Sequence, residues 1–210
     1  MFGKDKKYIQ INNGINSEYF KFDLIKRKNV RKKLNISENE ILLGYVGRLT
    51  AVKNPNFMLK ILKEINNKNN NYKLILVGDG ELKEELIAKG KELKIENKVI
   101  FYGNSKNVSE LLQAIDIFIM PSLHEGFPIS LVEAQATGLK CIVSENVTKK
   151  VNITGLVKFI SLKENEQYWA EYIIKESRYN RINMNEVIKE KHFDEKEISK
   201  QIKEILRKVG

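Results

Sequence analysis

Short apolar runs alternate with amphipathic stretches along most of the chain. The runs typical of buried strands span residues 41–46, 74–77, 99–103, 115–120, 140–143 and 155–160. Stretches with apolar residues at helical spacing, or with helix start and stop signals, predict helices over 56–66, 81–93, 108–114, 129–137, 165–177, 185–190 and 195–209. Strands that alternate with helices favour a parallel sheet covered on both faces. We therefore predict an α/β domain, doubly wound, around a mainly parallel sheet of about six strands.

The first 36 residues follow a different pattern. A short apolar run at 8–11 predicts a strand, and the turn signal Asn12-Asn13-Gly14 ends it. We interpret residues 1–36 as an entry segment and residues 37–210 as one domain. A chain of 210 residues is long enough for one well-filled hydrophobic core.

Composition narrows the class of protein. No apolar run approaches the length that crosses a bilayer, and the first residues lack the apolar stretch of a signal peptide. The single cysteine, Cys141, lies in an apolar run and has no partner for an internal disulfide. We expect a cytoplasmic protein, with peripheral attachment to the inner face of the cell membrane as an additional location.

The net charge of +10 has no single obvious cause in the sequence. Lysines are spread along the chain, which is typical of solvated helix faces. A nucleic-acid-binding protein would more often interleave basic and aromatic residues in one patch, so we expect no nucleic acid as a partner. A diffuse positive field would favour a diphosphate substrate or an anionic membrane surface.

The stretch from Ile117 to Ile142 has the richest pattern in the chain. Its opening strand stops at Pro121, and a five-residue loop leads to Pro128, which suits the first turn of a helix. The predicted helix over 129–137 ends at Gly138, a residue favoured just beyond a helix. The loop therefore lies at the carboxyl end of a strand, where open α/β sheets bind ligands.

The start of this helix has the chemistry of an anion site. Backbone N–H groups around Ile129, Ser130 and Leu131 have no helical partner and lie at the positive end of the helix dipole. Ser130 adds a hydroxyl, and the carboxylates of Glu125 and Glu133 flank these groups in the sequence. Each carboxylate would accept hydrogen bonds from hydroxyl groups on either side of a phosphate. A diphosphate between two polyhydroxylated groups is a nucleotide sugar.

The pattern Glu-Gly-Phe-Pro-x-x-Leu-x-Glu-Ala-x-Ala-x-Gly, from Glu125 to Gly138, resembles the donor-site signature of the retaining glycosyltransferases of family four. The resemblance implies the GT-B fold, in which this chain is the donor-binding, C-terminal half. It implies that Glu133 binds the ribose and Glu125 the transferred sugar. The donor-binding residues that it assigns to this stretch are Glu125, Gly126, Phe127, Pro128, Ile129, Ser130, Leu131 and Glu133.

A second loop carries two cations after the strand 41–46. It contains Gly47 and Arg48, and Lys53 follows shortly before the next helix. A guanidinium can bind two phosphate oxygens at once, and an ammonium adds a point charge. The resemblance assigns Gly47, Arg48 and Lys53 to the donor diphosphate, so that Arg48, Lys53 and Glu125 are the predicted catalytic residues.

Two other strand ends are weaker candidates. Residues Gly78-Asp79-Gly80 lack the third glycine of a dinucleotide-binding loop, and we interpret Asp79 as turn and cap chemistry. The resemblance places the nucleotide base near Tyr102, Gly103 and Val108. The sequence has no Asp-x-Asp element and no cluster of His and Cys, so we expect no metal and no other cofactor.

The resemblance also implies partners. The run Asn13-Gly14-Ile15-Asn16 with Phe20 resembles the point where family members enter their second domain, which would leave an N-terminal GT-B domain absent from this chain. The run from Ala134 to Ser144 is most similar to bacterial enzymes of capsular or exopolysaccharide synthesis, whose acceptors are saccharides or lipid-linked saccharides. Residues 147–155 depart from the glycine-rich segment common in the family, which leaves the subfamily open.

These observations favour the donor-binding domain of a retaining glycosyltransferase, with a nucleotide sugar, in the first place a UDP-sugar, as donor. Three alternatives stay open on sequence alone, of which a purely structural domain of an assembly is the simplest. A sugar-nucleotide epimerase of GT-B shape would share the binding chemistry, although the pair of glutamates argues against it. A basic nucleic-acid-binding module is the non-enzymatic alternative, and its retention on RNA would depend on salt.

Overall fold

The computed structural model describes residues 11–209, so most of the strand predicted at 8–11 lies outside the described residues. The α-helices and strands are, in chain order, α1 (Leu24–Lys33), β1 (Ile41–Val46), α2 (Pro55–Lys68), β2 (Tyr72–Val77), α3 (Lys83–Glu92), β3 (Val99–Gly103), α4 (Val108–Ala114), β4 (Ile117–Met120), α5 (Ile129–Ala136), β5 (Lys140–Ser144), β6 (Val157–Ile160), α6 (Glu166–Glu176), α7 (Asn185–Glu190) and α8 (Glu195–Val209). Short 3₁₀ turns occupy Ala51–Lys53, Glu96–Lys98 and Lys149–Val151.

The six strands form one sheet in the order β3-β2-β1-β4-β5-β6, and every pair is parallel. This confirms the predicted doubly wound α/β class. The strand order changes direction between β1 and β4, which pair through Leu43 with Ile117 and Gly44 with Phe118. In such sheets the carboxyl ends of the two strands at this switch point diverge from their neighbours and leave a crevice.

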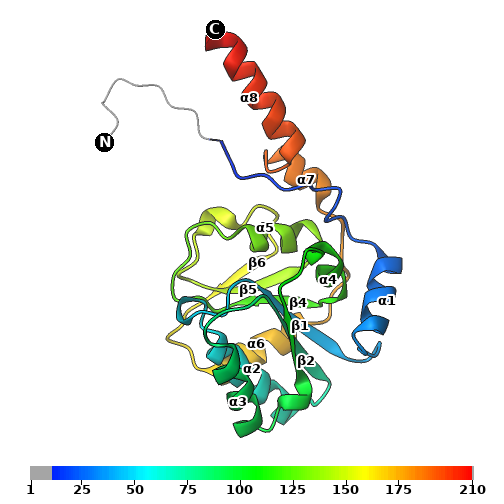
Figure 1. Cartoon of the computed structure of the whole chain (residues 1–210), viewed down its shortest axis with the longest axis vertical. Helices are drawn as coiled ribbons and strands as arrows, with labels where there is room; N and C mark the ends of the chain where they lie inside the picture. The colour runs from blue at the N-terminus through cyan, green and yellow to red at the C-terminus, as the bar shows by residue number, and fades with distance from the viewer. Residues whose placement is uncertain (1–10, 210) are drawn as a thin grey trace.

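Helices cover both faces of the sheet (Figure 1). Helices α2, α3 and α6 lie on one face, where the rings of Phe57 and Trp169 meet edge to face with centroids 5.7 Å apart. Helices α4 and α5 lie on the other face. All four residues of β4 are buried, as a strand between two helical layers requires. The sheet is therefore the centre of the hydrophobic core.

Helix α1 is a feature that the sequence pattern did not predict. Asp23 caps its start by accepting hydrogen bonds from the backbone N–H groups of Ile25 and Lys26. Its inner face is polar, because Arg27 and Arg31 both bind the Asp116 carboxylate, at 2.5 and 3.0 Å. Part of the predicted entry segment, from residue 23 on, thus packs on the domain.

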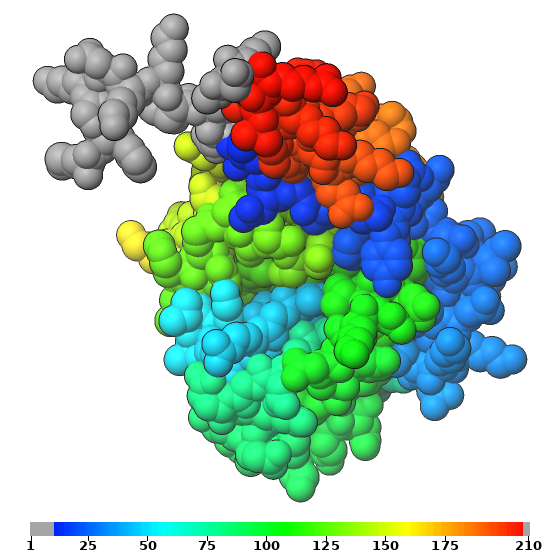
Figure 2. All heavy atoms as spheres, turned by 45° about the horizontal axis from the view of Figure 1, so that its top comes forward, coloured from blue at the N-terminus to red at the C-terminus, as the bar shows by residue number. Residues whose placement is uncertain are grey.

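The two ends of the described chain lie together. The N–H of Ile15 donates to the Phe193 carbonyl at 2.8 Å, and Ser17 Oγ donates to Asp194 Oδ2 at 2.6 Å. Figure 2 shows α8 beside this amino-terminal segment. Ile198 of α8 is buried, whereas Leu206, two turns further on, is 66% exposed. No helix within the described range is long and apolar enough to cross a membrane.

Candidate functional site

The predicted cations and carboxylates follow the two strands at the switch point of the sheet. Arg48 and Lys53 lie in the loop after β1, and Glu125 lies in the loop after β4. The main chains of the two loops are joined, because the N–H of Leu123 donates to the Val52 carbonyl at 2.8 Å. Charged residues from both loops therefore lie at the switch point of the sheet.

Close packing of glycines fixes the start of the β1 loop. The N–H of Gly47 donates to the Val77 carbonyl, which ties the loop to the end of β2. A Cβ atom on Gly78 would collide with the carbonyl oxygen of Gly47, so position 78 has no room for a side chain. The hydroxyl of Tyr45 donates to the Arg48 carbonyl at 3.1 Å. Burial raises the pKa of Tyr45, which keeps this hydroxyl protonated as a donor.

Lys53 and Glu125 meet directly across the crevice. The ammonium of Lys53 contacts Glu125 Oε1, and the same oxygen accepts a hydrogen bond from Ser122 Oγ at 3.3 Å. The side chain of Glu125 is 10% exposed and that of Lys53 26%. The ion pair is thus largely withdrawn from water, yet one edge of it is open to a ligand.

Two buried serines support this pair from beneath, and sequence analysis missed both. Ser144, at the end of β5, donates from Oγ to the Ser122 carbonyl at 2.5 Å. Ser122 and Ser144 are fully buried. The loop gains a further support from Asn146, whose amide donates to the Leu123 carbonyl at 3.0 Å. The signal available in the sequence was that Ser144 directly follows an apolar run and that Ser122 follows Pro121, which ends another.

Helix α5 presents free amide groups beside the pair. Its N-cap, Pro128, makes no side-chain capping bond, and the N–H groups of Ile129 and Ser130 have no partner among the described residues. The Leu131 N–H differs from the prediction because it donates to the Pro128 carbonyl at 3.1 Å, and the Leu131 side chain is buried. The first turn of α5 therefore offers two free amides instead of three.

The same helix ends as the sequence predicts. Gly138 adopts a φ of 72°, in the left-handed region. Its N–H donates to the Gln135 carbonyl, and the N–H of Leu139 donates to the Ala134 carbonyl, the two bonds of a Schellman cap. This cap fixes the length of α5, and with it the place of its first turn.

Ser130 and Glu133 lie three positions apart on the half-exposed face of α5. Burial raises the pKa of Glu133, because the surrounding protein disfavours the carboxylate relative to water. No hydrogen bond or ion pair joins the side chain of Glu133 to another described residue. A partly buried carboxylate without a partner is suited to accept hydrogen bonds from a ligand.

A separate pocket opens beyond Arg48, over the ends of β1, β2 and β3. Its volume is about 230 Å³. The predicted residues Gly47, Arg48 and Val108 line it, together with Asp79, Asn104 and Ser105, which sequence analysis had not assigned to the site. Asn104 and Ser105 directly follow β3, and this position at a strand end was the signal that could have found them.

The other base-pocket candidates, Tyr102 and Gly103, lie outside this lining. The ring of Tyr102 is 44% exposed. Gly103 serves the fold, because its carbonyl accepts a hydrogen bond from the N–H of Gly78 at 2.8 Å. Asp79 makes the predicted turn, where its Oδ1 accepts from the Gly80 N–H at 2.9 Å, but it does not cap α3.

The side chain of Phe127 lies against the segments near the two ends of the described chain. Its ring stacks on that of Phe193, with the centroids 5.5 Å apart and the planes nearly parallel. Both rings line a groove of about 250 Å³ with Asn12, Asn13 and Lys150. Gly126 beside it faces open space, since a Cβ atom there would meet nothing within 4 Å. Thus Gly126 leaves the approach to Glu125 clear, while Phe127 and Pro128 set the course of the loop.

The six-stranded parallel sheet with helices on both faces is a Rossmann-like domain of the GT-B type, and the charged loops lie at its switch point. The chain belongs to the family described as glycosyl transferases group 1, whose model matches residues 26–191. This confirms the resemblance drawn from the Glu125–Gly138 motif.

Two relatives illustrate the match. The chain is 37% identical over 162 residues to a putative glycosyltransferase, EpsF, of Bacillus subtilis. The aligned residues make up 77% of this chain and 42% of EpsF. It is 35% identical over 137 residues to an Escherichia coli enzyme, UDP-Gal:alpha-D-GlcNAc-diphosphoundecaprenol alpha-1,3-galactosyltransferase, covering 64% of this chain and 35% of the enzyme. The chain therefore spans less than half the length of these relatives.

Solved structures share the fold. Anabaena Alr3699/HepE, crystallised with UDP and glucose, superposes with a TM-score of 0.79 at 22% identity, covering 94% of this chain and 56% of that one. The C-terminal domain of a glycosyl transferase group 1 protein, LpcC, from Francisella tularensis superposes with a TM-score of 0.68 at 19% identity. It covers 85% of this chain and 98% of that domain.

Proposed function

We propose that this chain is the donor-binding domain of a retaining glycosyltransferase that takes its sugar from a nucleotide sugar, in the first place a UDP-sugar. The observation that carries the proposal is the meeting of Lys53 and Glu125 between the loops that follow β1 and β4. The free amides of Ile129 and Ser130, at the start of α5, follow Glu125 in the same segment of the chain.

The proposed binding mode follows from this geometry. The nucleotide base enters the pocket beyond Arg48, and Glu133 accepts hydrogen bonds from the ribose hydroxyls. The diphosphate lies between Arg48, Lys53 and the two free amides, and Glu125 binds hydroxyls of the sugar. The helix dipole of α5 adds to the attraction for the phosphates.

In the proposed reaction, the bond between the anomeric carbon and the β-phosphate oxygen breaks, and an acceptor hydroxyl oxygen bonds to that carbon. Negative charge develops on the departing diphosphate, which takes up the proton of the acceptor hydroxyl. Arg48, Lys53 and the amides of α5 stabilise that charge as it forms, which is the main catalytic contribution that such a site makes. A diphosphate also competes with Glu125 for the Lys53 ammonium. Donor binding would thereby free the Glu125 carboxylate for the sugar hydroxyls.

The remaining partners are part of the same proposal. A second, N-terminal GT-B domain would close the crevice and hold the acceptor, a saccharide or a lipid-linked saccharide in bacterial capsule or exopolysaccharide synthesis. Two observations support this: the chain spans 42% of its relative EpsF, and its fold matches 98% of the isolated C-terminal domain of LpcC. We place the enzyme in the cytoplasm.

Calorimetric titration of the purified chain with UDP, GDP and ADP tests the proposal. We expect saturable binding of UDP, and weaker or no binding of the purine nucleotides. Uridine, which lacks the diphosphate, serves as the control for the base pocket alone. If none of the three diphosphates binds, the assignment of the crevice is wrong.

A further inference from the structure

The positive charge of the chain is concentrated on one helix. Residues 21–33, which include all of α1, contain seven lysines and arginines but a single acid, Asp23, whereas the whole chain has a net charge of +10. The lysines of α1 lie on a solvated helix face, as expected, but they form a denser group than the chain as a whole. A patch of positive charge on one helix indicates a local function, whereas positive charge spread over the whole surface does not.

Only part of this charge is neutralised within the fold. Arg27 and Arg31 bind Asp116, and Asp23 is used as the helix cap. The lysines of α1 are different: all of them are exposed, and none forms an ion pair with a described residue. They are Lys26, Lys28, Lys32 and Lys33. Like charges such as Lys28 and Lys32, at i and i+4 on an exposed helix, repel by about 0.2–0.5 kcal/mol, which an anionic partner would relieve.

Two aliphatic side chains accompany these lysines. Leu24 and Ile25, in the first turn of α1, are 57% and 72% exposed. A groove of about 530 Å³ runs along the helix between Leu24, Lys28 and Lys32 and ends near Ile36. Glu38 adds one acidic side chain to its far end. Several lysines beside two exposed aliphatic residues have the composition of a surface that anionic lipids attract electrostatically.

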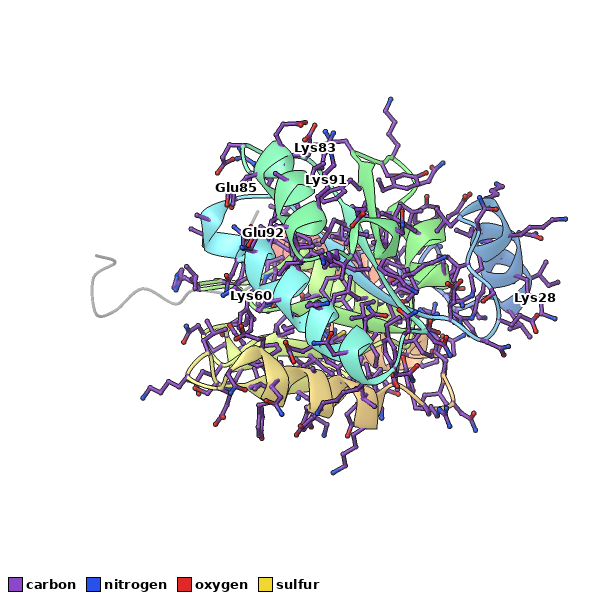
Figure 3. All side chains as sticks on the ribbon, turned by 90° about the horizontal axis from the view of Figure 1, so that it is seen from below. Lys28, Lys60, Lys83, Glu85, Lys91 and Glu92 are labelled. Atoms are coloured by element: carbon purple, nitrogen blue, oxygen red, sulfur yellow. The ribbon has the colours of Figure 1, made fainter. Side chains whose placement is uncertain are left out.

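This surface, formed by Leu24, Ile25 and the four lysines, lies away from the nucleotide site. Helix α1 is anchored by Asp116, just before the amino end of β4, whereas Lys53 and Glu125 follow the carboxyl ends of β1 and β4. Figure 3 shows Lys28 at the outer edge of the molecule, away from Lys91 on α3. An occupant of the α1 surface would leave the crevice open.

We propose that the α1 surface binds anionic phospholipids at a membrane surface. The lysines attract the phosphate groups, and Leu24 and Ile25 enter the boundary between headgroups and acyl chains. Nucleic acid fits the surface less well, because α1 has no aromatic residue for base stacking, and Phe22 before it packs under Arg181 with a cation–π distance of 4.4 Å. This binding does not depend on the donor site proposed above.

Cosedimentation of the purified chain with phosphatidylcholine vesicles, with and without phosphatidylglycerol, tests the proposal. We expect partition onto the anionic vesicles that falls steeply with salt, and little onto the neutral ones. The double variant Lys28→Gln/Lys32→Gln should lower the partition coefficient about tenfold or more, given the contribution of each lysine near an anionic surface. Ile25→Gln should lower it several-fold at high and low salt alike.

The matched control is Lys91→Gln/Lys163→Gln, which removes the same charge from exposed lysines on and near other helices. It should keep partition within about twofold of the parent chain, since the effect of net charge alone is weak at physiological salt. Gln and Lys have similar helix propensities, so thermal melts followed by circular dichroism should coincide for all variants.

The proposal is overturned if the two double variants show the same loss of partition onto anionic vesicles. It is also overturned if the chain binds neutral vesicles as strongly as anionic ones. It is likewise overturned if a single-stranded RNA binds more tightly than the anionic vesicles and loses affinity in the α1 variants. Calorimetry with UDP on the same samples reports the donor site separately. Vesicle binding without UDP binding would refute only the proposed function. UDP binding without vesicle binding would refute only the proposal that the α1 surface binds membranes.

Discussion

The ammonium of Lys53 contacts the carboxylate of Glu125, although 72 positions separate the two residues in the sequence. The contact exists because β1 and β4 are neighbours at the switch point, and each residue lies in the loop that follows one of these strands. In the absence of a ligand each side chain partly neutralises the other. A bound diphosphate would replace Glu125 as the partner of the Lys53 ammonium. Binding therefore does not leave the ammonium buried without a partner of opposite charge.

Arg48 is the sharpest test of the diphosphate assignment. Its side chain is exposed, makes no ion pair with the described residues and borders the pocket over the ends of β1, β2 and β3. Arg48→Ala should weaken UDP binding by about 1.5–3 kcal/mol, the scale of a hydrogen bond to a charged group. Lys53→Ala should cost the same or less, because it also releases Glu125. Calorimetry measures both.

Uridine and a second arginine provide the controls for that experiment. Uridine binding should hardly change in Arg48→Ala, because the nucleoside has no phosphate. Arg178→Ala removes an exposed arginine that follows α6 and should leave UDP affinity as it is. If Arg48→Ala binds UDP as tightly as the parent chain, Arg48 does not hold the diphosphate.

The two glutamates should separate the ribose from the sugar. Glu133→Gln keeps the size of the side chain but weakens its acceptance of hydroxyl hydrogen bonds, so affinity should fall by about 1–2 kcal/mol for both UDP and a UDP-sugar. Glu125→Gln should weaken only the UDP-sugar and leave UDP unchanged or slightly tighter, because Lys53 is then free for the phosphates. Parallel titrations of both ligands measure this. Equal losses for UDP at both positions would contradict the separate roles.

Sequence patterns predicted the strands, which are buried on both faces of the sheet. They did not predict α1, a helix that packs on the domain through polar groups. The six strands are apolar runs, and helices such as α2 and α5 carry apolar stripes or clear end signals. Helix α1 has neither: Val30 is its one buried apolar residue, and Arg27 and Arg31 make the rest of its inner face. Hydrophobic periodicity cannot detect a helix whose contact surface consists of guanidinium groups that bind carbonyl oxygens.

The sequence predicts which charged residues lie at the candidate site, but it does not predict which of them are in contact. Strand ends located Arg48, Lys53 and Glu125, since parallel strands bring their carboxyl ends to one edge. Nothing in the order of residues shows that Lys53 and Glu125 touch, or that Ser144 supports Ser122 from the next strand. Phe127 matched the motif, yet its stacking on Phe193 depends on how the last part of the chain returns to the domain.

Asp116 should be the most sensitive charged residue for stability. It binds Arg27 and Arg31 and also accepts a hydrogen bond from the Leu42 N–H at 2.7 Å. Burial lowers the pKa of Arg31, and the neighbouring Asp116 carboxylate opposes this shift by stabilising the guanidinium charge. Asp116→Ala leaves two largely buried cations unpaired and should cost about 3 kcal/mol or more of unfolding free energy.

Urea unfolding of Asp116→Ala and of Glu171→Ala measures this difference. Glu171 also pairs with a lysine, Lys68, but both side chains are about half exposed, and the loss of such a pair costs less than about 1 kcal/mol. A similar shift in the two variants would show that α1 contributes little to the stability of the domain.

Cys141 should report opening of the core. Its thiol is fully buried in β5, and burial raises its pKa, so the reactive thiolate is scarce in the folded chain. A colourless aromatic disulfide reagent should therefore react slowly with the native chain and rapidly in denaturant. Lys163→Cys in the background Cys141→Ala provides an exposed thiol as a control, and it should react at the rate of a free thiol. Equal rates for the two native proteins would contradict the buried position of Cys141.

The last prediction concerns transfer itself and rests on the proposed function. A crevice bounded only by the loops after β1 and β4 and the start of α5 holds one reactant, and water reaches the sugar from the open side. The rate advantage of two reactants held in one geometry is then lost, and it amounts to about 7–11 kcal/mol of the barrier at most. We expect the purified chain to bind UDP-sugars in calorimetry, yet to transfer no measurable sugar to saccharide or lipid-linked acceptors. A protein that joins this chain to a GT-B N-terminal domain should transfer sugar under the same conditions, and Arg48→Ala in that protein should lower the rate. Efficient transfer by the chain alone would show that this chain already contains an acceptor site, and the exposed apolar residues Ile202 and Leu206 of α8 would be the first place to look for it.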